Sequence, residues 1–452
     1  SSGSSVPPVG FGNSHYEESM APSVTVSLRQ VEDLTSRERD TMLQLIDLMK
    51  LRKEVIVFRI GVITALSLSL ILGIGALAQT TQSETEVPGI RVTPDDDLQA
   101  AINQAPVGAK ILLASGTYTG NFVINKDLEI VSEQSGKAVL QGKELQKPVL
   151  RIEGDGVKVK IEGLVVQKAL GKECAREYPD WLCADGISAC GSVSVTIVKV
   201  TVRGNGSHGI AGYLGASLSI QQSEITRNVG AGLFLRDGSI AEVQDTVITE
   251  NSTGVYCWLD DATCTIESSE ISANDRGVLV DYGGRFYAKD LQVLDNDGFG
   301  IWLTDDGRAE LEECEIDGNK IGVVAEDRTR ITLKSTTVSS HFGAGLQGGG
   351  RSRITLEDCT VELNGGHGLD LSDSCRATIR NTVISDNAGN GISLLESPRV
   401  TIVDSEITGN GEWGIFSHLE KCGWTTDAFT GVVLIRDTEV SDNEAGDTCL
   451  PE

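Results

Sequence analysis

The repeat in residues 376–416, RATIRNTVISDNAGNGISLLESPRVTIVDSEITGNGEWGIF, decides the fold. The alternating segment RATIRNTVIS starts at residue 376 and RVTIVDSEIT starts at residue 399, so the pattern returns after 23 residues. An asparagine follows each segment, and four residues later comes a glycine with an aliphatic neighbour: Asn387 with Gly391, and Asn410 with Gly414. Alternation of β-branched residues with Ser and Thr is typical of half-buried strands.

The same glycine recurs ten times from Gly209 to Gly414, always after 22 or 23 residues. An asparagine stands three or four residues before the glycine in every unit except the one that carries His341. A period of this length predicts a solenoid in which each unit is one coil. The asparagines are Asn205, Asn228, Asn251, Asn274, Asn296, Asn319, Asn364, Asn387 and Asn410.

These patterns predict an all-β parallel β-helix with 22–23-residue coils. Identical positions of neighbouring coils would then stack about 4.8 Å apart. We expect the stacked asparagines to form a ladder of hydrogen bonds that satisfies buried backbone groups. We expect the glycines to supply a left-handed or crowded backbone.

Residues 93–130 are expected to begin this domain with a short amphipathic helix and several strands. The acidic run Asp95 to Asp97 suits a helix N-terminus. A helix here would cover the open end of the solenoid, whose first coil otherwise presents bare strand edges.

Residues 60–78, IGVITALSLSLILGIGALA, contain no charge and are long enough to cross a bilayer. Basic residues precede this run and none follows until Arg91, which predicts a cytoplasmic N-terminus and an extracytoplasmic repeat domain. We expect a single-pass anchor. The alternative is a signal peptide cleaved near Ala78, with secretion of the remainder.

The chain of 452 residues is accordingly divided into five parts. These are a low-complexity N-terminus (1–26), a juxtamembrane helix (27–59), the transmembrane or signal segment (60–78), a linker (79–92) and the β-helix domain (93–452).

The series LQAAINQA, ILLASGTY and LEI, followed by coils of the N-x-x-x-G-I type, resembles the pectin-lyase-like superfamily of right-handed parallel β-helices. Within that superfamily the chain is most similar to NosD-type and other parallel β-helix repeat proteins of microbial envelopes. The resemblance implies the fold. It implies no single activity, because the superfamily contains lyases, hydrolases, esterases and proteins without known catalysis.

His367, in the motif Gly-His-Gly, is the one apparent catalytic signal. Hydrolases of this fold carry that motif together with Asn-Thr-Asp and Arg-Ile-Lys, and this chain has neither. The slot before the repeat glycine holds His, Ala, Thr, Arg, Phe, Ile, Asn or Trp in other units. We therefore assign His367 to the repeat and expect no catalytic residue.

Ten cysteines indicate an oxidising compartment. The candidate disulfide cysteines are Cys174, Cys183, Cys257, Cys264, Cys422 and Cys449, and sequence alone leaves their pairing open. Cys314 and Cys359 occupy a slot that other units fill with Ser or Thr, so we expect them to be free, stacked thiols.

The turn after the glycine strand is the sharpest candidate site for a cation or a glycan. Stacked coils are expected to align its acidic residues in one file, with Arg285, Arg308, Arg330 and Arg376 beside it. In lyases of this fold, Asp-bound Ca²⁺ neutralises a uronate and Arg or Lys takes a proton, and the resemblance would carry both roles here. We favour the simpler interpretation, turn-forming Asp paired with Arg across coils, with weak Ca²⁺ binding at most. The residues are Asp260, Asp261, Asp281, Asp305, Asp306, Arg285 and Arg308.

Three function classes follow. We favour a non-catalytic envelope scaffold, glycan-binding or adhesive module, or accessory subunit, because the units are regular and enzymes need cleft-forming loops. The alternatives are a polysaccharide lyase or glycoside hydrolase and a NosD-type accessory factor for metal-cofactor maturation. Tyr178 and Trp181, in the insertion near residues 170–184, are a candidate stacking surface. The partners expected are the bilayer, a polysaccharide or an envelope protein; a net charge of −27 argues against nucleic acid.

Overall fold

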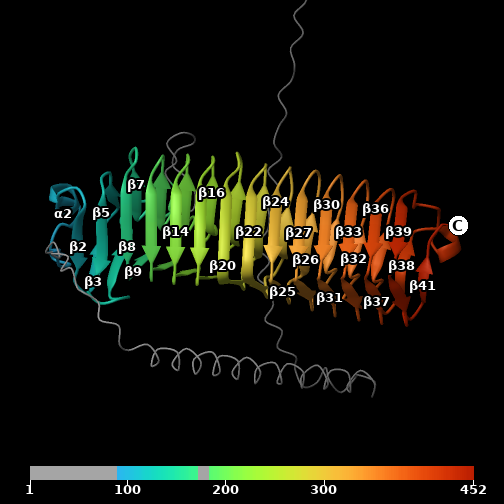
Figure 1. Cartoon of the computed structure of the whole chain (residues 1–452). Helices are drawn as coiled ribbons and strands as arrows, with labels where there is room; N and C mark the ends of the chain where they lie inside the picture. Colours follow the sequence, from blue (N-terminus) through green and yellow to red (C-terminus); the bar gives the residue numbers. More distant parts are fainter. Residues whose placement is uncertain (1–88, 172–182, 452) are drawn as a thin grey trace, which may run out of the picture. The chain divides into compact units, whose positions relative to one another are not determined.

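The computed structural model describes residues 89–171 and 183–451, all within the second of two units of the chain, Glu86–Glu452. These residues form a parallel β-solenoid (Figure 1). The transmembrane or signal segment 60–78 and the juxtamembrane helix lie outside the described residues. Within the described part, no helix is long and apolar enough to cross a membrane.

Three parallel rows of strands run along the solenoid, and each coil adds one strand to each row. Two rows belong to a 27-stranded sheet, sheet A, and are called row 1 and row 2 here. The third row is a 14-stranded sheet, sheet B. The strands β20 (Thr263–Ser272) and β22 (Arg285–Leu294) run without a break through rows 1 and 2 and join them.

The other strands of row 1 are β1 (Ile90–Val92), β2 (Ala109–Leu113), β5 (Leu128–Ser132), β8 (Lys158–Glu162), β11 (Ser194–Val198), β14 (Ser217–Gln221), β17 (Ile240–Gln244), β24 (Arg308–Glu312), β27 (Arg330–Lys334), β30 (Arg353–Glu357), β33 (Arg376–Arg380), β36 (Arg399–Val403) and β39 (Val432–Arg436). The other strands of row 2 are β3 (Gly116–Thr119), β6 (Ala138–Gln141), β9 (Leu164–Gln167), β12 (Thr201–Arg203), β15 (Glu224–Thr226), β18 (Val247–Thr249), β25 (Glu315–Asp317), β28 (Thr337–Ser339), β31 (Thr360–Glu362), β34 (Val383–Ser385), β37 (Glu406–Thr408) and β40 (Glu439–Ser441).

Sheet B consists of β4 (Phe122–Ile124), β7 (Leu150–Glu153), β10 (Ile187–Cys190), β13 (Ile210–Tyr213), β16 (Ala231–Arg236), β19 (Thr253–Trp258), β21 (Arg276–Asp281), β23 (Phe299–Leu303), β26 (Ile321–Ala325), β29 (Leu346–Gly348), β32 (Leu369–Leu371), β35 (Ile392–Leu394), β38 (Trp413–Ser417) and β41 (Gly446–Cys449).

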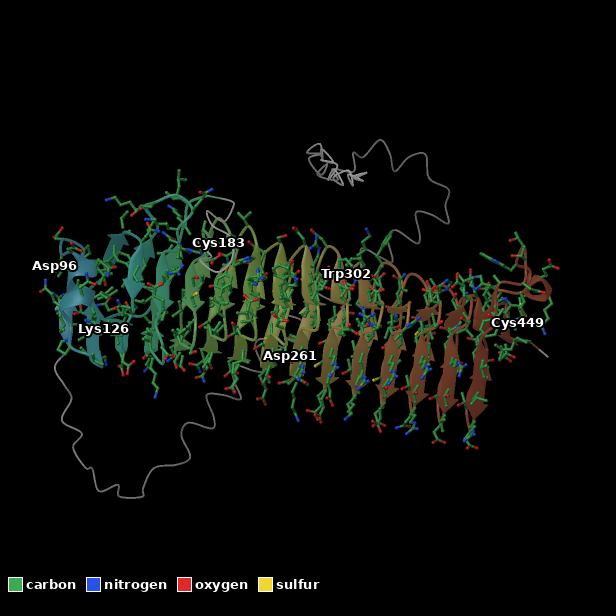
Figure 2. All side chains as sticks on the ribbon, turned by 90° about the horizontal axis from the view of Figure 1, so that it is seen from above. Asp96, Lys126, Cys183, Asp261, Trp302 and Cys449 are labelled. Atoms are coloured by element: carbon green, nitrogen blue, oxygen red, sulfur yellow. A yellow bond between two sulfur atoms is a disulfide. The ribbon has the colours of Figure 1, made fainter. Side chains whose placement is uncertain are left out.

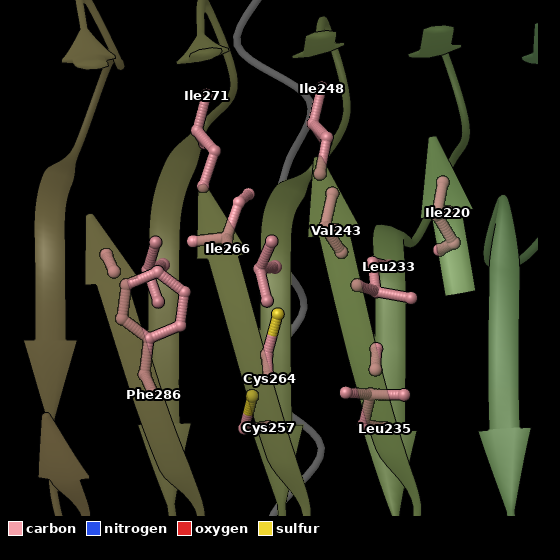
Figure 3. Packing of buried hydrophobic residues seen from close by; sticks show 14 of the residues in the cluster. Ile220, Leu233, Leu235, Val243, Ile248, Cys257, Cys264, Ile266, Ile271 and Phe286 are labelled. Carbon is pink, nitrogen blue, oxygen red and sulfur yellow. The ribbon is translucent and has the colours of Figure 1, made fainter. Parts of the chain in front are cut away.

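One hydrophobic core fills the solenoid from Val92 to Phe429. Its residues come from alternate positions of all three rows, so each rung contributes aliphatic side chains that stack on those of the next (Figure 3). This alternation is the period-two pattern that the sequence displays. The predicted all-β parallel β-helix with 22–23-residue coils is confirmed.

A short helix, α2 (Leu98–Gln104), precedes the regular coils. Asp97 caps it by accepting a hydrogen bond from Ala100 N–H at 3.0 Å. Leu98 and Ile102 lie in the main core. The amide of Gln99 donates to Val123 C=O at 3.0 Å and accepts from Val123 N–H at 2.8 Å. It therefore pairs with β4, the first strand of sheet B.

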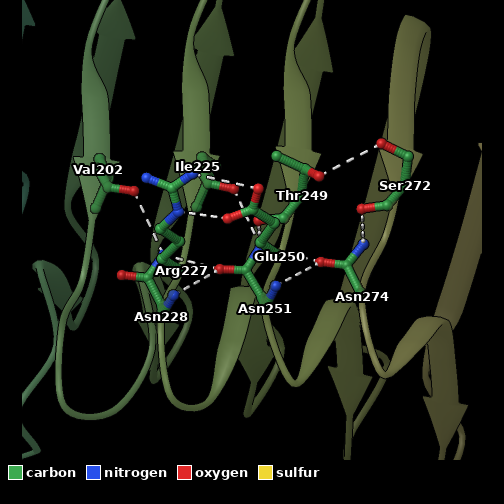
Figure 4. A network of polar contacts seen from close by, with 9 residues as sticks. All are labelled: Val202, Ile225, Arg227, Asn228, Thr249, Glu250, Asn251, Ser272 and Asn274. Carbon is green, nitrogen blue, oxygen red and sulfur yellow. Dashed lines mark hydrogen bonds and ion pairs between the residues drawn. The ribbon is translucent and has the colours of Figure 1, made fainter. Parts of the chain in front are cut away.

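The asparagine ladder lies at the turn between row 2 and sheet B (Figure 4). Asn228 Oδ1 accepts from the backbone N–H of Asn205 at 3.1 Å and from its Nδ2 at 2.9 Å, and Asn228 Nδ2 donates to Asn251 Oδ1 at 2.9 Å. The predicted ladder asparagines are all buried. Asn443, 33 residues after Asn410, extends the ladder by one rung.

The repeat glycines are required by close packing and not by a left-handed backbone conformation. A Cβ at Gly209 would lie 2.6 Å from a methyl of Ile225 and 2.7 Å from Nδ2 of Asn228. The left-handed bend falls one residue before the asparagine, at Arg227 (φ 58°) and at the equivalent residue of other coils. Glycine is thus needed because the next ladder residue occupies its side-chain space.

Candidate functional site

The turn between sheet B and row 1 holds most of the predicted acidic file. Asp260, Asp261, Asp305 and Asp306 all have positive φ, between 44° and 66°, which Asp tolerates better than most residues. Asp281 does not join them. It is the last residue of β21 and pairs in register with Trp258, so it lies on the outer face of sheet B.

Two of the acidic residues form ion pairs with arginines of the next coil. Arg285 contacts Asp261 at 2.8 Å, and Arg328 contacts Asp306 at 2.6 Å. The hydrogen bond from Arg328 lowers the pKa of the Asp306 carboxyl. Both pairs are largely exposed, so solvent screens them and they contribute little to the stability of the fold. Within the described residues, no group of three or more His, Cys, Asp or Glu is placed to hold a metal ion.

Arginine occupies the first position of six successive row 1 strands. The register pairs Arg285 with Arg308 and continues in single steps through Arg330, Arg353, Arg376 and Arg399. Neighbouring guanidinium groups therefore start from backbones about 4.8 Å apart. We call these six residues the arginine ladder.

Most of the ladder lacks acidic partners. Arg285 is paired with Asp261, whereas the guanidinium groups of the next five arginines form no hydrogen bond or ion pair with any residue in the described part of the chain. All five side chains are exposed. Like charges directly opposite each other destabilise a sheet, so this arrangement is costly unless an anion offsets it.

Threonine follows each arginine by two residues in the last four rungs, so it shares the same face of sheet A. Thr332, Thr355, Thr378 and Thr401 are in register and partly exposed. Row 1 from β27 to β36 therefore presents parallel lines of guanidinium and hydroxyl groups, which we call the arginine–threonine face. It is defined by Arg330, Arg353, Arg376, Arg399, Thr332, Thr355, Thr378 and Thr401.

The C-terminal end of this face is hollowed. A pocket of about 250 Å³ is lined by Arg376 and Arg399, by the hydroxyl-bearing residues Ser374, Ser397 and Thr430, and by Gly431 and Val432. Positive charge and hydroxyl groups therefore converge at one end of the ladder.

The outer face of sheet B carries an aromatic cluster that the sequence patterns did not reveal. His208 stacks on Phe234 at 4.2 Å between ring centroids, and Phe234 meets Tyr256 edge-on at 5.4 Å. The guanidinium of Arg236 lies 4.2 Å from the ring centroid of Trp258. The sequence patterns do not reveal this cluster because its members lie on different coils, and within each strand they alternate with core residues.

A buried carboxyl lies beside this cluster. Asp185 is fully buried, accepts from the Tyr213 hydroxyl at 3.0 Å and accepts from the backbone N–H of His208 at 3.1 Å. Burial raises its pKa to about 6, against the opposing effect of these hydrogen bonds. Tyr178 and Trp181, the expected stacking surface, lie outside the described residues.

Sheet B also carries an acidic pocket of about 370 Å³ over β26, β29 and β32. Carboxylates of Glu326, Asp327, Asp370 and Asp373 line it. Gly349 borders this space, where an added Cβ would lie 3.4 Å from Asp373 Oδ2.

His367 has a structural role in the repeat. Its Nδ1 accepts the backbone N–H of Asn390 at 2.9 Å, just as His208 Nδ1 accepts Ala231 N–H at 3.0 Å. In these two coils the histidine before the repeat glycine thus satisfies a backbone donor of the next coil.

The cysteine predictions have different outcomes. Cys422 and Cys449 form a disulfide, and Cys183 is disulfide-bonded. Cys174, another candidate, lies outside the described residues. The prediction that Cys257 and Cys264 take part in disulfides is wrong. Both are free and buried, because each occupies a core-facing strand position rather than the turn between them (Figure 3). The Cys257 side chain and burial raise the pKa of the Cys264 thiol. Cys314 and Cys359 are free and buried.

A family model described as the right-handed beta helix region matches residues 185–338 and 276–423, which together span more than half of the chain. This chain belongs to the right-handed β-helix family. The right-handed parallel β-helix that the resemblance implied is confirmed with it. A search of curated protein sequences gave no significant match.

Solved structures similar to this β-helix protein include the A-module of mannuronan C-5 epimerase AlgE4 of Azotobacter vinelandii, with 14% identity, coverage of 78% of this chain and 94% of that chain, and a TM-score of 0.48. Pectate lyase Pel9A has 16% identity, coverage of 60% and 77%, and a TM-score of 0.41. The periplasmic alginate epimerase AlgG has 15% identity, coverage of 77% and 83%, and a TM-score of 0.44. At these identities the likeness is one of fold.

The sequence predicted Arg285, Arg308, Arg330 and Arg376 beside the acidic turns of this β-helix protein, but not Arg353, Arg399 or a continuous ladder. The signal was present, because RITLK, RITLE, RATIR and RVTIV each begin a row 1 strand with the pattern Arg-x-Thr. Reading the repeat for its exposed positions, as well as for its buried ones, would have found it.

Proposed function

We propose that this right-handed β-helix protein is a non-catalytic glycan-binding module. In this proposal a linear acidic polysaccharide lies along the solenoid on the arginine–threonine face. The observation that carries it is the unpaired run of five in-register arginines from Arg308 to Arg399.

Guanidinium groups suit this role because their planar donors match carboxylate and sulfate groups in two-point contacts. A ladder with one arginine per coil can contact several anionic groups of one polymer, and simultaneous contacts raise the effective affinity. The threonine hydroxyls beside the ladder can donate to or accept from sugar hydroxyls. A bound anionic chain would also relieve the repulsion between stacked arginines.

The regularity of the face supports binding without catalysis. A reaction needs different groups converging on one bond, such as a nucleophile and an acid. The arginine–threonine face instead repeats the same two groups over four coils. The third outward position of these strands varies, with Lys334, Glu357, Arg380 and Val403, so only the Arg and Thr positions are equivalent from coil to coil.

The direct test is binding of polygalacturonate and of alginate to the full chain. We expect the affinity to fall when NaCl rises from about 0.01 M to about 1 M, because the Debye length shrinks from roughly 30 Å to roughly 3 Å. The double variant Arg353→Ser/Arg376→Ser should bind at least tenfold more weakly, a loss of about 1.4 kcal/mol.

A matched control removes two arginines elsewhere. Arg203→Ser/Arg227→Ser changes the net charge by the same amount but leaves the ladder intact, since Arg203 bonds Gln167 and Arg227 pairs with Glu250. It should bind like the parent. Equal weakening by both double variants would show non-specific charge attraction, and failure of both polymers to bind the parent would reject the proposal.

We also propose that residues 60–78 hold the chain at a membrane, with residues 79–452 outside the cytoplasm. The uncharged length of that segment and the basic residues before it support this arrangement. It would place the arginine–threonine face where envelope polysaccharides occur.

A further inference from the structure

The last coil is ten residues longer than most of the five coils before it. Successive ladder arginines from Arg285 to Arg399 are 22 or 23 residues apart, whereas Arg399 and its partner Val432 are separated by 33. The additional residues form a loop at 418–431 beside the outer face of sheet B. Loops added to a regular scaffold are common sites of function.

The loop is fixed at several points. The disulfide between Cys422 and Cys449 ties it to β41, at the C-terminal end of the solenoid, where Figure 2 labels Cys449. The carbonyl of His418 accepts the backbone N–H groups of Ala428 and Phe429 at 2.8 and 3.1 Å. A loop held in this way can form one wall of a preformed site.

This loop and the turn before β38 enclose a pocket of about 480 Å³. Its volume lies within the range of small-molecule sites. Aromatic rings form much of its wall, and polar groups of two histidines, an asparagine and a glutamate join them. The lining side chains used below are Trp413, Phe416, Trp424, His367, His418 and Glu412.

The aromatic walls are held by specific contacts. Trp413 packs against the backbone of Gly446, where an added Cβ would lie 2.6 Å from the indole ring. His418 meets Phe416 edge-on at 4.9 Å and Trp424 edge-on at 4.4 Å. Trp424 remains 44% exposed, so one of its faces is available to a ligand.

The two histidines offer complementary hydrogen-bonding atoms. His367 Nδ1 accepts the Asn390 backbone N–H, so in the neutral ring Nε2 carries the proton and can donate. His418 Nδ1 lies 2.7 Å from the Leu394 carbonyl and must donate to it, so Nε2 of the neutral ring can accept. Aromatic surface combined with a donor, an acceptor and a carboxylate matches a pyranose, which has apolar C–H faces and a rim of hydroxyls.

The negative charge around the pocket disfavours the binding of uronate sugars. Glu412 lines it, Glu420 and Asp427 lie on the loop, and Glu444 follows the ladder residue Asn443. Lys421 is the one basic residue of the loop. A carboxylated sugar would meet like charge here, unlike on the arginine–threonine face.

We propose that this C-terminal pocket is a second carbohydrate site that binds one neutral pyranose residue of a glycan. It is separate from the arginine–threonine face and does not depend on that face binding polyanions. The sugar ring stacks on Trp424, and its hydroxyls bond Glu412, His367 Nε2 and His418 Nε2.

The test titrates the full chain with three neutral hexasaccharides: cellohexaose, xylohexaose and mannohexaose. Calorimetry and tryptophan fluorescence follow binding. At least one hexasaccharide should bind with a Kd of about 1 mM or tighter. Trp424→Ala should weaken that binding at least tenfold, and Glu412→Gln should weaken it measurably.

Two controls separate this site from other effects. Trp302→Ala removes a tryptophan from another coil of sheet B and should leave binding unchanged. Arg353→Ser/Arg376→Ser should bind the neutral sugar like the parent, even if it loses polyanions. Thermal unfolding of each variant checks that the partly exposed Trp424 is dispensable for folding.

Three results would overturn the proposal. The first is that none of the three hexasaccharides binds. The second is that binding survives Trp424→Ala. The third is that oligogalacturonate, rather than a neutral sugar, occupies the pocket and is lost with Trp424→Ala.

Discussion

His341 Nδ1 accepts a hydrogen bond of 3.0 Å from the backbone N–H of Asn319. Its own backbone N–H donates to Asn364 Oδ1 at 3.1 Å. Histidine therefore fills the one rung where the asparagine series is interrupted in the sequence, and the ladder continues through it. Because Nδ1 is an acceptor, the ring must be neutral in this position.

This role predicts a pH dependence that His341→Asn should reduce. Burial lowers the pKa of His341 to about 4, from 6.5 in the unfolded chain. Between those values the unfolded state binds a proton that the folded state does not, so folding stability is complete above about pH 6.5 and is lost as the pH falls toward 4. The loss is about 3 kcal/mol for one group.

Chemical denaturation of the parent and of His341→Asn at pH 7 and pH 4.5 provides the measurement. The parent should lose more stability than the variant. Burial shifts the pKa values of His208 and Asp185 to about 4 and about 6. Both proteins contain these two groups, so their contributions to the pH dependence cancel when the variant is compared with the parent. Identical pH profiles for the two proteins would contradict the ladder role of His341.

Asn296→Leu should destabilise the middle coils by about 3 kcal/mol or more, through unpaired buried groups. Asn296 Oδ1 accepts from the Asn274 backbone at 3.0 Å, and Asn296 Nδ2 donates to Asn319 at 2.8 Å. The urea midpoint should fall clearly. Asn125→Leu, at an exposed asparagine of the turn after β4, is the control and should have little effect. Equal midpoints for Asn296→Leu and the parent would be incompatible with an internal ladder.

Cys422→Ser/Cys449→Ser should loosen the C-terminal coil. The bond closes a segment with a sequence separation of 27, for which loop-closure entropy suggests about 3–4 kcal/mol. We expect faster proteolysis within residues 418–431 and weaker binding of neutral hexasaccharides, while polygalacturonate binding changes little. The control variant Cys314→Ser removes a free, buried thiol and should not expose the loop.

The acidic turns should bind Ca²⁺ no more tightly than about 10⁻³ M, the range of weak sites. Asp261 and Asp306 are already paired with arginines, and the two doublets lie two rungs apart, about 9.6 Å, which exceeds the reach of one ion. We expect no unsaturated products from polygalacturonate or alginate, with or without Ca²⁺. A submicromolar affinity abolished by Asp305→Ala, or lyase turnover lost in Arg308→Ala, would place the protein among the enzymes.

The orientation of the chain is also testable. If residues 60–78 anchor it with the N-terminus in the cytoplasm, protease added to intact spheroplasts should degrade the repeat domain and spare residues 1–53. Permeabilised cells, in which both sides are cut, are the control. A repeat domain that survives in intact spheroplasts would reverse the assignment.

Local periodicity in the sequence determined the fold. The spacing of Gly391 and Gly414, the asparagines before them and the alternating segments define the coil length, and coil length with alternation requires a solenoid. Exposed positions follow from the same alternation, so the arginine–threonine face was within reach of the sequence. The coil length, the solenoid fold and the exposed face depend only on contacts between equivalent residues one repeat apart, and the repeat itself encodes those contacts.

Other features depended on the tertiary structure, because they arise where the repeat is broken. The register assigned Asp281 to the outer face of sheet B, since one residue more or less in a turn changes which residues align. Cys257 and Cys264 flank a turn in the sequence, but the strand pleat directs both toward the core. The path of residues 418–431, and hence the pocket between Trp413 and Trp424, is fixed by a disulfide and by contacts with distant coils, which no local pattern encodes.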